Sequence, residues 1–237
     1  MMIRGLGGIG DKAGSVSHAI GGFFPGRCAV CGATGASPCR ACVVPIRSHA
    51  VAPRVVVPLW CSSVVSPFAY DGPVRTIITA SKYRGSTRGL VFLAGRMAEA
   101  VLAARPDFAD FAEHGERGER GETLVTWAPT SPQRHRRRGY DQAQLLAQHT
   151  AMLLGLRCER LLVHRSDSQA QTGASRHERS LRVERFRPVP VSAGSRSGGV
   201  LLIDDVMTTG ATLSGAARVL RDAGAPCVNA LVAAVTL

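Results

Sequence analysis

An apolar run that ends in two adjacent carboxylates constrains the fold of this 237-residue chain more than any other segment. Residues 200–203 are all apolar, as expected of a parallel strand that is buried on both faces. Asp204 and Asp205 follow, and after a short turn apolar residues recur at helical spacing, at Leu213, Ala216, Ala217 and Leu220. The segment therefore predicts a strand, a turn and a helix, with the acidic pair at the carboxyl end of the strand.

The turn after the acidic pair has the composition of an anion-binding loop and contains Thr208, Thr209, Gly210, Ala211 and Thr212. Unpaired N–H groups and the dipole at a helix amino end attract an anion, glycine lets the backbone approach it, and threonine hydroxyls add donors. Asp204 and Asp205 can accept hydrogen bonds from vicinal ribose hydroxyls, directly or with a bound magnesium ion. We therefore expect a ribose 5-phosphate site. The alternative is a helix cap and a threonine-rich turn that bind no ligand.

Residues 200–212 resemble the binding motif of type I phosphoribosyltransferases. In that family an acidic pair holds the ribose of phosphoribosyl pyrophosphate (PRPP), and the following loop wraps its 5-phosphate. The resemblance implies the ribose role for Asp204 and Asp205 and the phosphate role for residues 208–212. Purine-salvage members carry an aspartate where this chain has Thr208, so a hypoxanthine or guanine substrate is not expected.

Two pairs of closely spaced cysteines form the second motif, Cys28 with Cys31 and Cys39 with Cys42. Four thiolates at this spacing can close a tetrahedron around zinc, and a small loop region without its own core gains folding energy from the metal. We expect a structural zinc site. Two disulfides or a redox pair are the alternatives, and a reducing cytoplasm and the spacing argue against them. The other cysteines, Cys61, Cys158 and Cys227, are isolated in the sequence and are expected to be small core residues.

Size and composition indicate one α/β domain with a small appendage, since 237 residues with 45% hydrophobic side chains suffice for a core. We expect a lead-in without regular structure at residues 1–22, a zinc finger at 23–50 and the main domain at 51–237. No run of about 18 apolar residues occurs, so no membrane span and a cytoplasmic location are expected. The net charge of +12 favours an anionic partner, but it is nearly all arginine and cannot choose between nucleotide, nucleic acid and pyrophosphate.

Strand and helix patterns alternate along the main domain. Strands are expected at 55–59, 64–70, 123–128, 160–164, 200–203 and 228–235, and helices at 74–83, 90–104, 141–154 and after residue 212. Residues 106–122 read as a polar insertion and 187–199 as a loop. This alternation predicts a parallel sheet with helices on both faces and with ligands at the carboxyl ends of its strands.

An arginine-rich segment, residues 133–143, lies between the 123–128 strand and the following helix. We interpret it as a loop whose guanidinium groups hold pyrophosphate opposite the acidic pair, with the candidates Arg134, Arg136, Arg137 and Arg138. Lys82 is a further candidate because lysine is rare in this chain. The alternatives are a solvated basic face, a nonspecific nucleic-acid patch and, for Lys82, one exposed charge on a helix.

In this order, the cysteines, the arginine segment and the acidic pair resemble the ComF family, named for a protein needed in bacterial DNA uptake. The family joins a four-cysteine zinc finger to a phosphoribosyltransferase-like domain. The resemblance also rests on Tyr-Asp-Gly-Pro-Val at 70–74, Lys-Tyr-Arg-Gly at 82–85 and Arg-Gly-Tyr-Asp-Gln at 138–142, and on Gln171, Glu178, Arg179 and Phe186. Asp141 and Arg182 depart from it, since an asparagine is more usual there.

Two classes of function follow. One is an enzyme that binds PRPP with magnesium and transfers ribose 5-phosphate to an unknown acceptor. No residue indicates a general base, because the histidines 135, 149, 164 and 177 are scattered. The other is a module without catalysis, for DNA uptake or nucleotide sensing, that binds single-stranded DNA or protein partners. With 5% aromatic residues, DNA binding would be mainly electrostatic.

Overall fold

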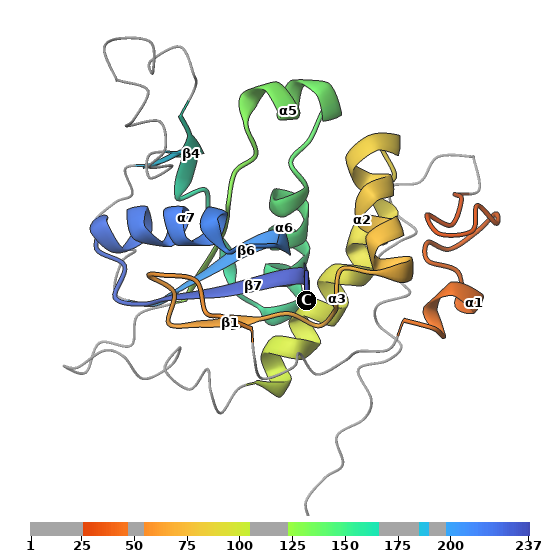
Figure 1. Cartoon of the computed structure of the whole chain (residues 1–237), viewed down its shortest axis with the longest axis horizontal. Helices are drawn as coiled ribbons and strands as arrows, with labels where there is room; N and C mark the ends of the chain where they lie inside the picture. The colour runs from red at the N-terminus through yellow and green to blue at the C-terminus, as the bar shows by residue number, and fades with distance from the viewer. Residues whose placement is uncertain (1–25, 47–54, 105–122, 166–184, 190–197) are drawn as a thin grey trace, which may run out of the picture.

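A computed structural model describes residues 26–46, 55–104, 123–165, 185–189 and 198–237 (Figure 1). Their central element is a five-stranded sheet of order β1-β7-β6-β2-β3, in which every pairing is parallel. The strands are β1 (Ser63–Val65), β2 (Leu124–Trp127), β3 (Arg157–Cys158), β6 (Val200–Met207) and β7 (Val228–Val235). The predicted α/β class with a parallel sheet is confirmed.

Helices cover both faces of this sheet, as predicted. One face packs against α2 (Gly72–Arg84), α3 (Arg88–Ala103) and α6 (Gln142–Leu154). The other face packs against α7 (Ala211–Asp222) and a hairpin of β4 (Leu162–His164) and β5 (Phe186–Pro188). Leu201 and Ile203 point to the first core and Val200 and Leu202 to the second, because side chains alternate along a strand. Burial on both faces explains why residues 200–203 are apolar without interruption.

Strand β6 is longer than its apolar run. Asp204 pairs with Val232 of β7, and the ladder continues until Met207 pairs with Val235. The acidic pair therefore lies inside the last half of the strand, and the turn begins later than its sequence suggests. The neighbouring strand causes this difference, since all eight residues of β7 are buried and offer ladder partners along their whole length.

The order of the strands places a crevice between β2 and β6. From β2 the chain passes through α5 (Pro132–Arg138) and α6 to β3 on one side, and it later returns to β6 on the other side of β2. Connections that leave in opposite directions open a crevice at the carboxyl ends of the two strands, where ligands of parallel sheets bind. The acidic pair of β6 faces this point.

Several predicted strands differ in the structure. Residues 55–59 form no strand, and Val56 and Leu59 are exposed. In the 64–70 segment only the start is a strand, because Pro67 cannot donate to a ladder; Ala69 forms a single bridge to Val235. Short β3, which was not predicted, edges the sheet.

The arginine segment and the hairpin also differ from the predictions. Residues 132–138 form the helix α5 and not a loop, with Ser131 as a cap that accepts from the Arg134 N–H and with Pro132 in the first turn. Residues 160–164 yield β4, which pairs antiparallel with β5 outside the parallel sheet. The loop predicted at 187–199 begins within β5, and most of its remainder lies outside the described residues.

The cysteine region lies beside α2 and α3 at the edge of the domain (Figure 1). It contains α1 (Arg40–Val43) and an isolated bridge between Arg27 and Thr34. Ala29 joins the core that α2 and α3 share, and Val30 and Ile46 pack against it. The predicted lead-in at 1–22 and the insertion at 106–122 fall outside the described residues. Within the described helices, none has the length and apolar character needed to cross a bilayer.

Candidate functional site

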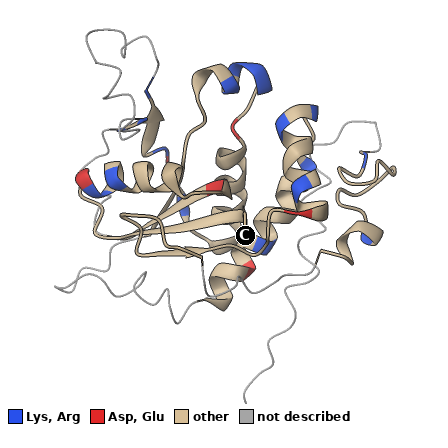
Figure 2. Ribbon diagram, viewed as in Figure 1, with Lys and Arg blue, Asp and Glu red and all other residues tan. Residues whose placement is uncertain are grey.

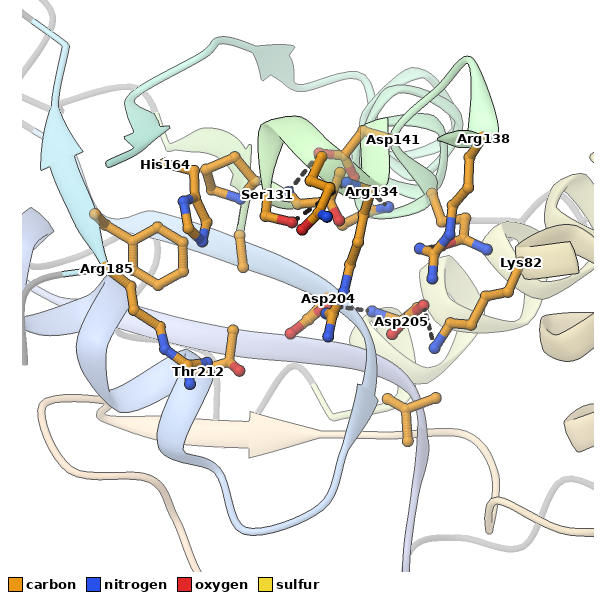
Figure 3. Close-up of a pocket in the computed structure, with 18 of the residues that line it drawn as sticks. Lys82, Ser131, Arg134, Arg138, Asp141, His164, Arg185, Asp204, Asp205 and Thr212 are labelled. Atoms are coloured by element: carbon orange, nitrogen blue, oxygen red, sulfur yellow. Dashed lines mark hydrogen bonds and ion pairs between the residues drawn. The ribbon is translucent and has the colours of Figure 1, made fainter. Parts of the chain in front are cut away.

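A pocket of about 600 Å³ opens at the crevice between β2 and β6 (Figure 3). Residues from the end of β2, from α5, from β6 and from the start of α7 meet in it, together with parts of α2 and of the β4–β5 hairpin. Its lining includes Tyr70, Lys82, Thr130, Ser131, Arg134, Arg138, Asp141, Gln142, His164, Arg185, Phe186, Asp204, Asp205, Thr208 and Thr212. This volume suits a ligand the size of a nucleotide.

The acidic pair forms the floor of the pocket and contacts a cation from another element. Asp205 Oδ2 lies 2.7 Å from the Lys82 ammonium of α2, and both side chains are less than one-fifth exposed, at 15% and 19%. Asp204 Oδ1 accepts a 2.8 Å hydrogen bond from the Asp205 N–H. Burial raises the pKa of Asp204 well above its usual range; repulsion from Asp205 adds to this, and Lys82 opposes it. The site therefore favours a cation beside these carboxylates.

The turn that follows β6 is shaped by glycine. Gly210 has φ 73°, in the left-handed region, and occupies the N-cap position of α7, while the neighbouring Thr209 hydroxyl accepts a 3.4 Å hydrogen bond from the Ala211 N–H. Thr208 and Thr212 line the pocket, whereas Thr209, Gly210 and Ala211 are not among its lining residues. The amino end of a twelve-residue helix thus meets the pocket with threonine donors on either side of the turn.

Only two of the four candidate arginines line the pocket, Arg134 and Arg138. Arg136 and Arg137 are exposed, and the guanidinium of Arg137 lies 5.8 Å from the ring centre of Tyr83. Arg138 is held by its Nη1, which donates a 2.6 Å hydrogen bond to Gln142 Oε1, while its buried Nε has no hydrogen-bond partner among the described residues. Arg138 therefore lines the pocket with one guanidinium nitrogen held by Gln142 and with further N–H donors unused by that bond.

Asp141 organises the wall above the acidic pair. Its Oδ1 accepts from the N–H groups of Ala143 and Gln144 and so caps α6, and its Oδ2 accepts a 2.8 Å bond from the Thr130 N–H. Burial raises its pKa, and these three backbone donors oppose that shift. Asp141 thus joins the end of β2 to the start of α6.

Two hydrogen bonds fix the carboxyl-terminal part of α2 against the α5–α6 junction. The Tyr140 hydroxyl donates to the carbonyl oxygen of Ser81, and Gln142 Nε2 donates a 3.0 Å bond to the Ser81 hydroxyl. Ser81 and Gln142 are both buried. Lys82 is the next residue, so these contacts place the base of its side chain at the edge of the pocket.

Sequence reasoning missed the contribution of the β4–β5 hairpin, which brings His164, Arg185 and Phe186 to the pocket (Figure 3). The rings of His164 and Phe186 pack edge to face with centroids 5.8 Å apart. His164 Nδ1 donates a 2.7 Å hydrogen bond to the Arg165 carbonyl oxygen, which fixes the orientation of the ring. In the sequence His164 is one of several scattered histidines, and no local signal marks its place, because only the antiparallel pairing of β4 with β5 brings it here. Gln171, Glu178, Arg179 and Arg182 lie outside the described residues.

The four motif cysteines come together at a separate position. The Sγ atoms of Cys28, Cys31, Cys39 and Cys42 all lie within 4.8 Å of one another, as a metal such as zinc requires. Burial opposes ionisation of Cys28, but backbone hydrogen bonds outweigh it and lower the pKa of that thiol to about 6. Desolvation and the neighbouring cysteines raise the pKa of Cys42 to about 12. A metal cation would let all four lose their protons, since it offsets this repulsion.

Comparison with known proteins yields only partial likenesses, and these are to solved structures. Neither a protein-family model nor a curated protein matches the chain. A solved structure described as the allosteric regulatory enzyme of purine biosynthesis matches 56% of this chain and 26% of its own length, with 21% identity and a TM-score of 0.33.

Proposed function

We propose that the pocket binds PRPP with magnesium and that the chain is a ComF-like protein with a phosphoribosyltransferase domain. The observation that carries this proposal is the meeting of the acidic pair of β6, the amino end of α7 and Arg138 in one pocket at the crevice between β2 and β6. In the proposed arrangement Asp204 and Asp205 hold the ribose hydroxyls. The hydroxyls of Thr208 and Thr212 and the backbone N–H groups at the start of α7 hold the 5-phosphate, while Thr209, Gly210 and Ala211 form the turn between the two threonines.

The pyrophosphate is assigned to the opposite wall. Arg138 and Arg134 supply guanidinium groups, and Lys82 supplies an ammonium from α2. Arg136 and Arg137 are not assigned to it because neither lines the pocket. The orphaned Nε of Arg138 supports this choice, since a buried donor without a partner costs stability until an acceptor reaches it.

The donor set also fits magnesium. Hard divalent cations prefer carboxylate oxygens, and Asp205 already contacts a cation in the form of the Lys82 ammonium. Asp204 and Asp205 would hold the ion, which when bound supplies charge neutralisation for a pyrophosphate leaving group. Around it, the arginines orient the pyrophosphate and the acidic pair orients the ribose ring, so that donor carbon and acceptor are held in line.

Calorimetry tests this proposal directly. PRPP with magnesium should release or absorb heat with wild type, and the double variant Asp204→Asn/Asp205→Asn should lose this signal while it keeps the fold. Asp222→Asn, an exposed carboxylate of α7, is the matched control and should bind as wild type does. Equal heats for wild type and the double variant would reject the site. A turnover screen with free bases and amines then identifies the acceptor.

We further propose that the four cysteines bind a structural zinc ion. We also propose that the chain divides into three regions, which are a lead-in at 1–22, a zinc finger at 23–50 and the phosphoribosyltransferase-like domain at 51–237. The arrangement of thiol groups supports the metal, and the parallel sheet supports the main domain. Zinc analysis of the purified chain tests the first part. Limited proteolysis tests the boundaries.

A second candidate function, DNA binding in uptake, is favoured by the basic outer side of α5. Arg136 and Arg137 are exposed, and Arg137 lies over the ring of Tyr83, which is 67% exposed. Figure 2 shows blue segments on α5 and on α2 nearby. Such a face can contact phosphates and stack one base. Arg136→Glu/Arg137→Glu should weaken binding of single-stranded DNA in a salt-dependent way and leave PRPP binding unchanged. Unchanged DNA affinity would exclude this face.

A further inference from the structure

Lys82 forms an ion pair in the pocket that its proposed contact with pyrophosphate does not explain. Its ammonium contacts Asp205 at 2.7 Å, on the carboxylate that the proposed function gives to ribose and magnesium. A carboxylate that is paired with a lysine is less available to a metal ion or to hydroxyl donors. The contact therefore competes with the proposed ligands of the same group.

The backbone that carries Lys82 is held firmly, whereas its side chain is long. Ser81 receives hydrogen bonds from Tyr140 and Gln142, which fasten the end of α2 to the α5–α6 junction. The lysine side chain has four rotatable carbon–carbon bonds beyond this anchor and ends in a compact charge. It can leave Asp205 and remain in the pocket without any movement of the helix.

A second partner for the ammonium would be present on the same side of the pocket. Lys82 and Arg138 both line it, and the orphaned Nε of Arg138 marks a place that lacks an acceptor (Figure 3). An anionic oxygen that entered there would satisfy the guanidinium and attract the lysine. The pyrophosphate of PRPP supplies such oxygens.

We propose that Lys82 is an exchangeable counterion of the site. Without ligand it neutralises Asp205; a divalent cation displaces it from that carboxylate, and the freed ammonium then pairs with the pyrophosphate. This inference rests on the proposed function for its second half only. Displacement by the cation depends on the Lys82–Asp205 contact alone.

Removal of the Lys82 ammonium tests both parts of the proposal, since affinity for a divalent cation should rise and affinity for PRPP should fall. In Lys82→Met, affinity for Mn²⁺, followed by electron paramagnetic resonance without PRPP, should rise roughly fivefold because a competing ion pair is gone. Affinity for PRPP in saturating magnesium, followed by calorimetry, should fall roughly tenfold because one charged partner is lost. Arg84→Met removes one positive charge from an exposed site on the same helix and should change neither value.

Unchanged or weaker Mn²⁺ binding in Lys82→Met, or no Mn²⁺ binding by wild type, overturns the exchange. Lys82→Gln serves as a second neutral variant if the first does not fold, and Lys82→Arg should restore the wild-type Mn²⁺ affinity. If Mn²⁺ affinity rises as expected but neither wild type nor any variant binds PRPP, displacement of Lys82 from Asp205 by the cation stands and the proposed function fails. If PRPP binds but Mn²⁺ affinity is unaffected by the substitution, the proposed function stands and the exchange fails.

Discussion

Arg138 Nη1 donates a 2.6 Å hydrogen bond to Oε1 of Gln142, four residues later in the chain, at the junction of α5 and α6. Gln142 uses its other amide atom to donate to the Ser81 hydroxyl of α2. One buried side chain thus orients an arginine of the pocket and also anchors the helix that carries Lys82. The amide suits this position because it both accepts and donates.

Gln142→Leu should therefore lower stability and ligand affinity together. The change removes the acceptor of the Arg138 guanidinium and one of the two partners of the buried Ser81 hydroxyl, which still donates to the Ile78 carbonyl oxygen. Loss of these bonds costs about 1–3 kcal/mol in the free energy of unfolding. Urea denaturation measures this cost, and calorimetry measures weaker PRPP binding. Gln148→Leu, on an exposed position of the same helix, should have neither effect. Wild-type stability of Gln142→Leu would show that the connection contributes nothing.

Gly210→Ala should destabilise the turn at the start of α7. The residue has φ 73°, where a Cβ costs about 1–2 kcal/mol, and the new Cβ would lie 3.1 Å from Pro58 Cγ. Thermal unfolding should show a lower midpoint, and PRPP affinity should fall because the turn shifts.

Gly215→Ala is the matched control within α7. Its Cβ would meet the Phe186 ring at an ordinary 3.9 Å, and alanine favours a helix interior by about 0.5–1 kcal/mol. Equal effects of the two substitutions would contradict the importance of the left-handed conformation at Gly210.

Stability should depend on pH through Asp141. Burial raises the folded-state pKa of this carboxyl above the 3.8 of an ordinary aspartate, so the folded state binds its proton more tightly than the unfolded state does. The stabilisation linked to that proton is complete below the unfolded pKa and is lost as pH rises through the folded pKa. The unfolding free energy of wild type minus that of Asp141→Asn should therefore decrease from acid toward neutral pH and then level off.

Chemical denaturation of both proteins across this pH range measures the difference. Asp222→Asn, at an exposed position, controls for the loss of one negative charge. A difference that is constant with pH, or that increases toward neutral pH, would contradict the raised pKa.

Cys39→Ser should remove the metal from the cysteine cluster. We expect about one zinc ion per wild-type chain and a small fraction of that in the variant, because three thiolates bind the ion far less tightly than four. Since Ala29 of this region joins the core shared by α2 and α3, the thermal midpoint should also fall. Elemental analysis and thermal unfolding measure the two effects. Cys61→Ser, outside the cluster, should retain the zinc; a wild-type chain that is folded without metal would contradict the site.

The sequence by itself determined the parts of this protein that depend on neighbours along the chain. The apolar residues 200–203 predicted a strand with two buried faces, and their alternation between two cores explains why the prediction was right. The spacing of the cysteines predicted a cluster because each pair closes a tight local turn. The same locality placed Gly210 at a turn, since its left-handed conformation is a property of one residue.

Only the tertiary structure decided how these parts meet. Strand pairing with β7 extended β6 through the acidic pair, and the order of the strands turned two distant segments into one crevice. The hairpin brought His164 to the pocket, and α2 brought Lys82 to Asp205, across a separation of more than one hundred residues in the chain. Such contacts depend on which strands become neighbours and on which helix face is buried, and no local pattern of residues encodes either of these choices.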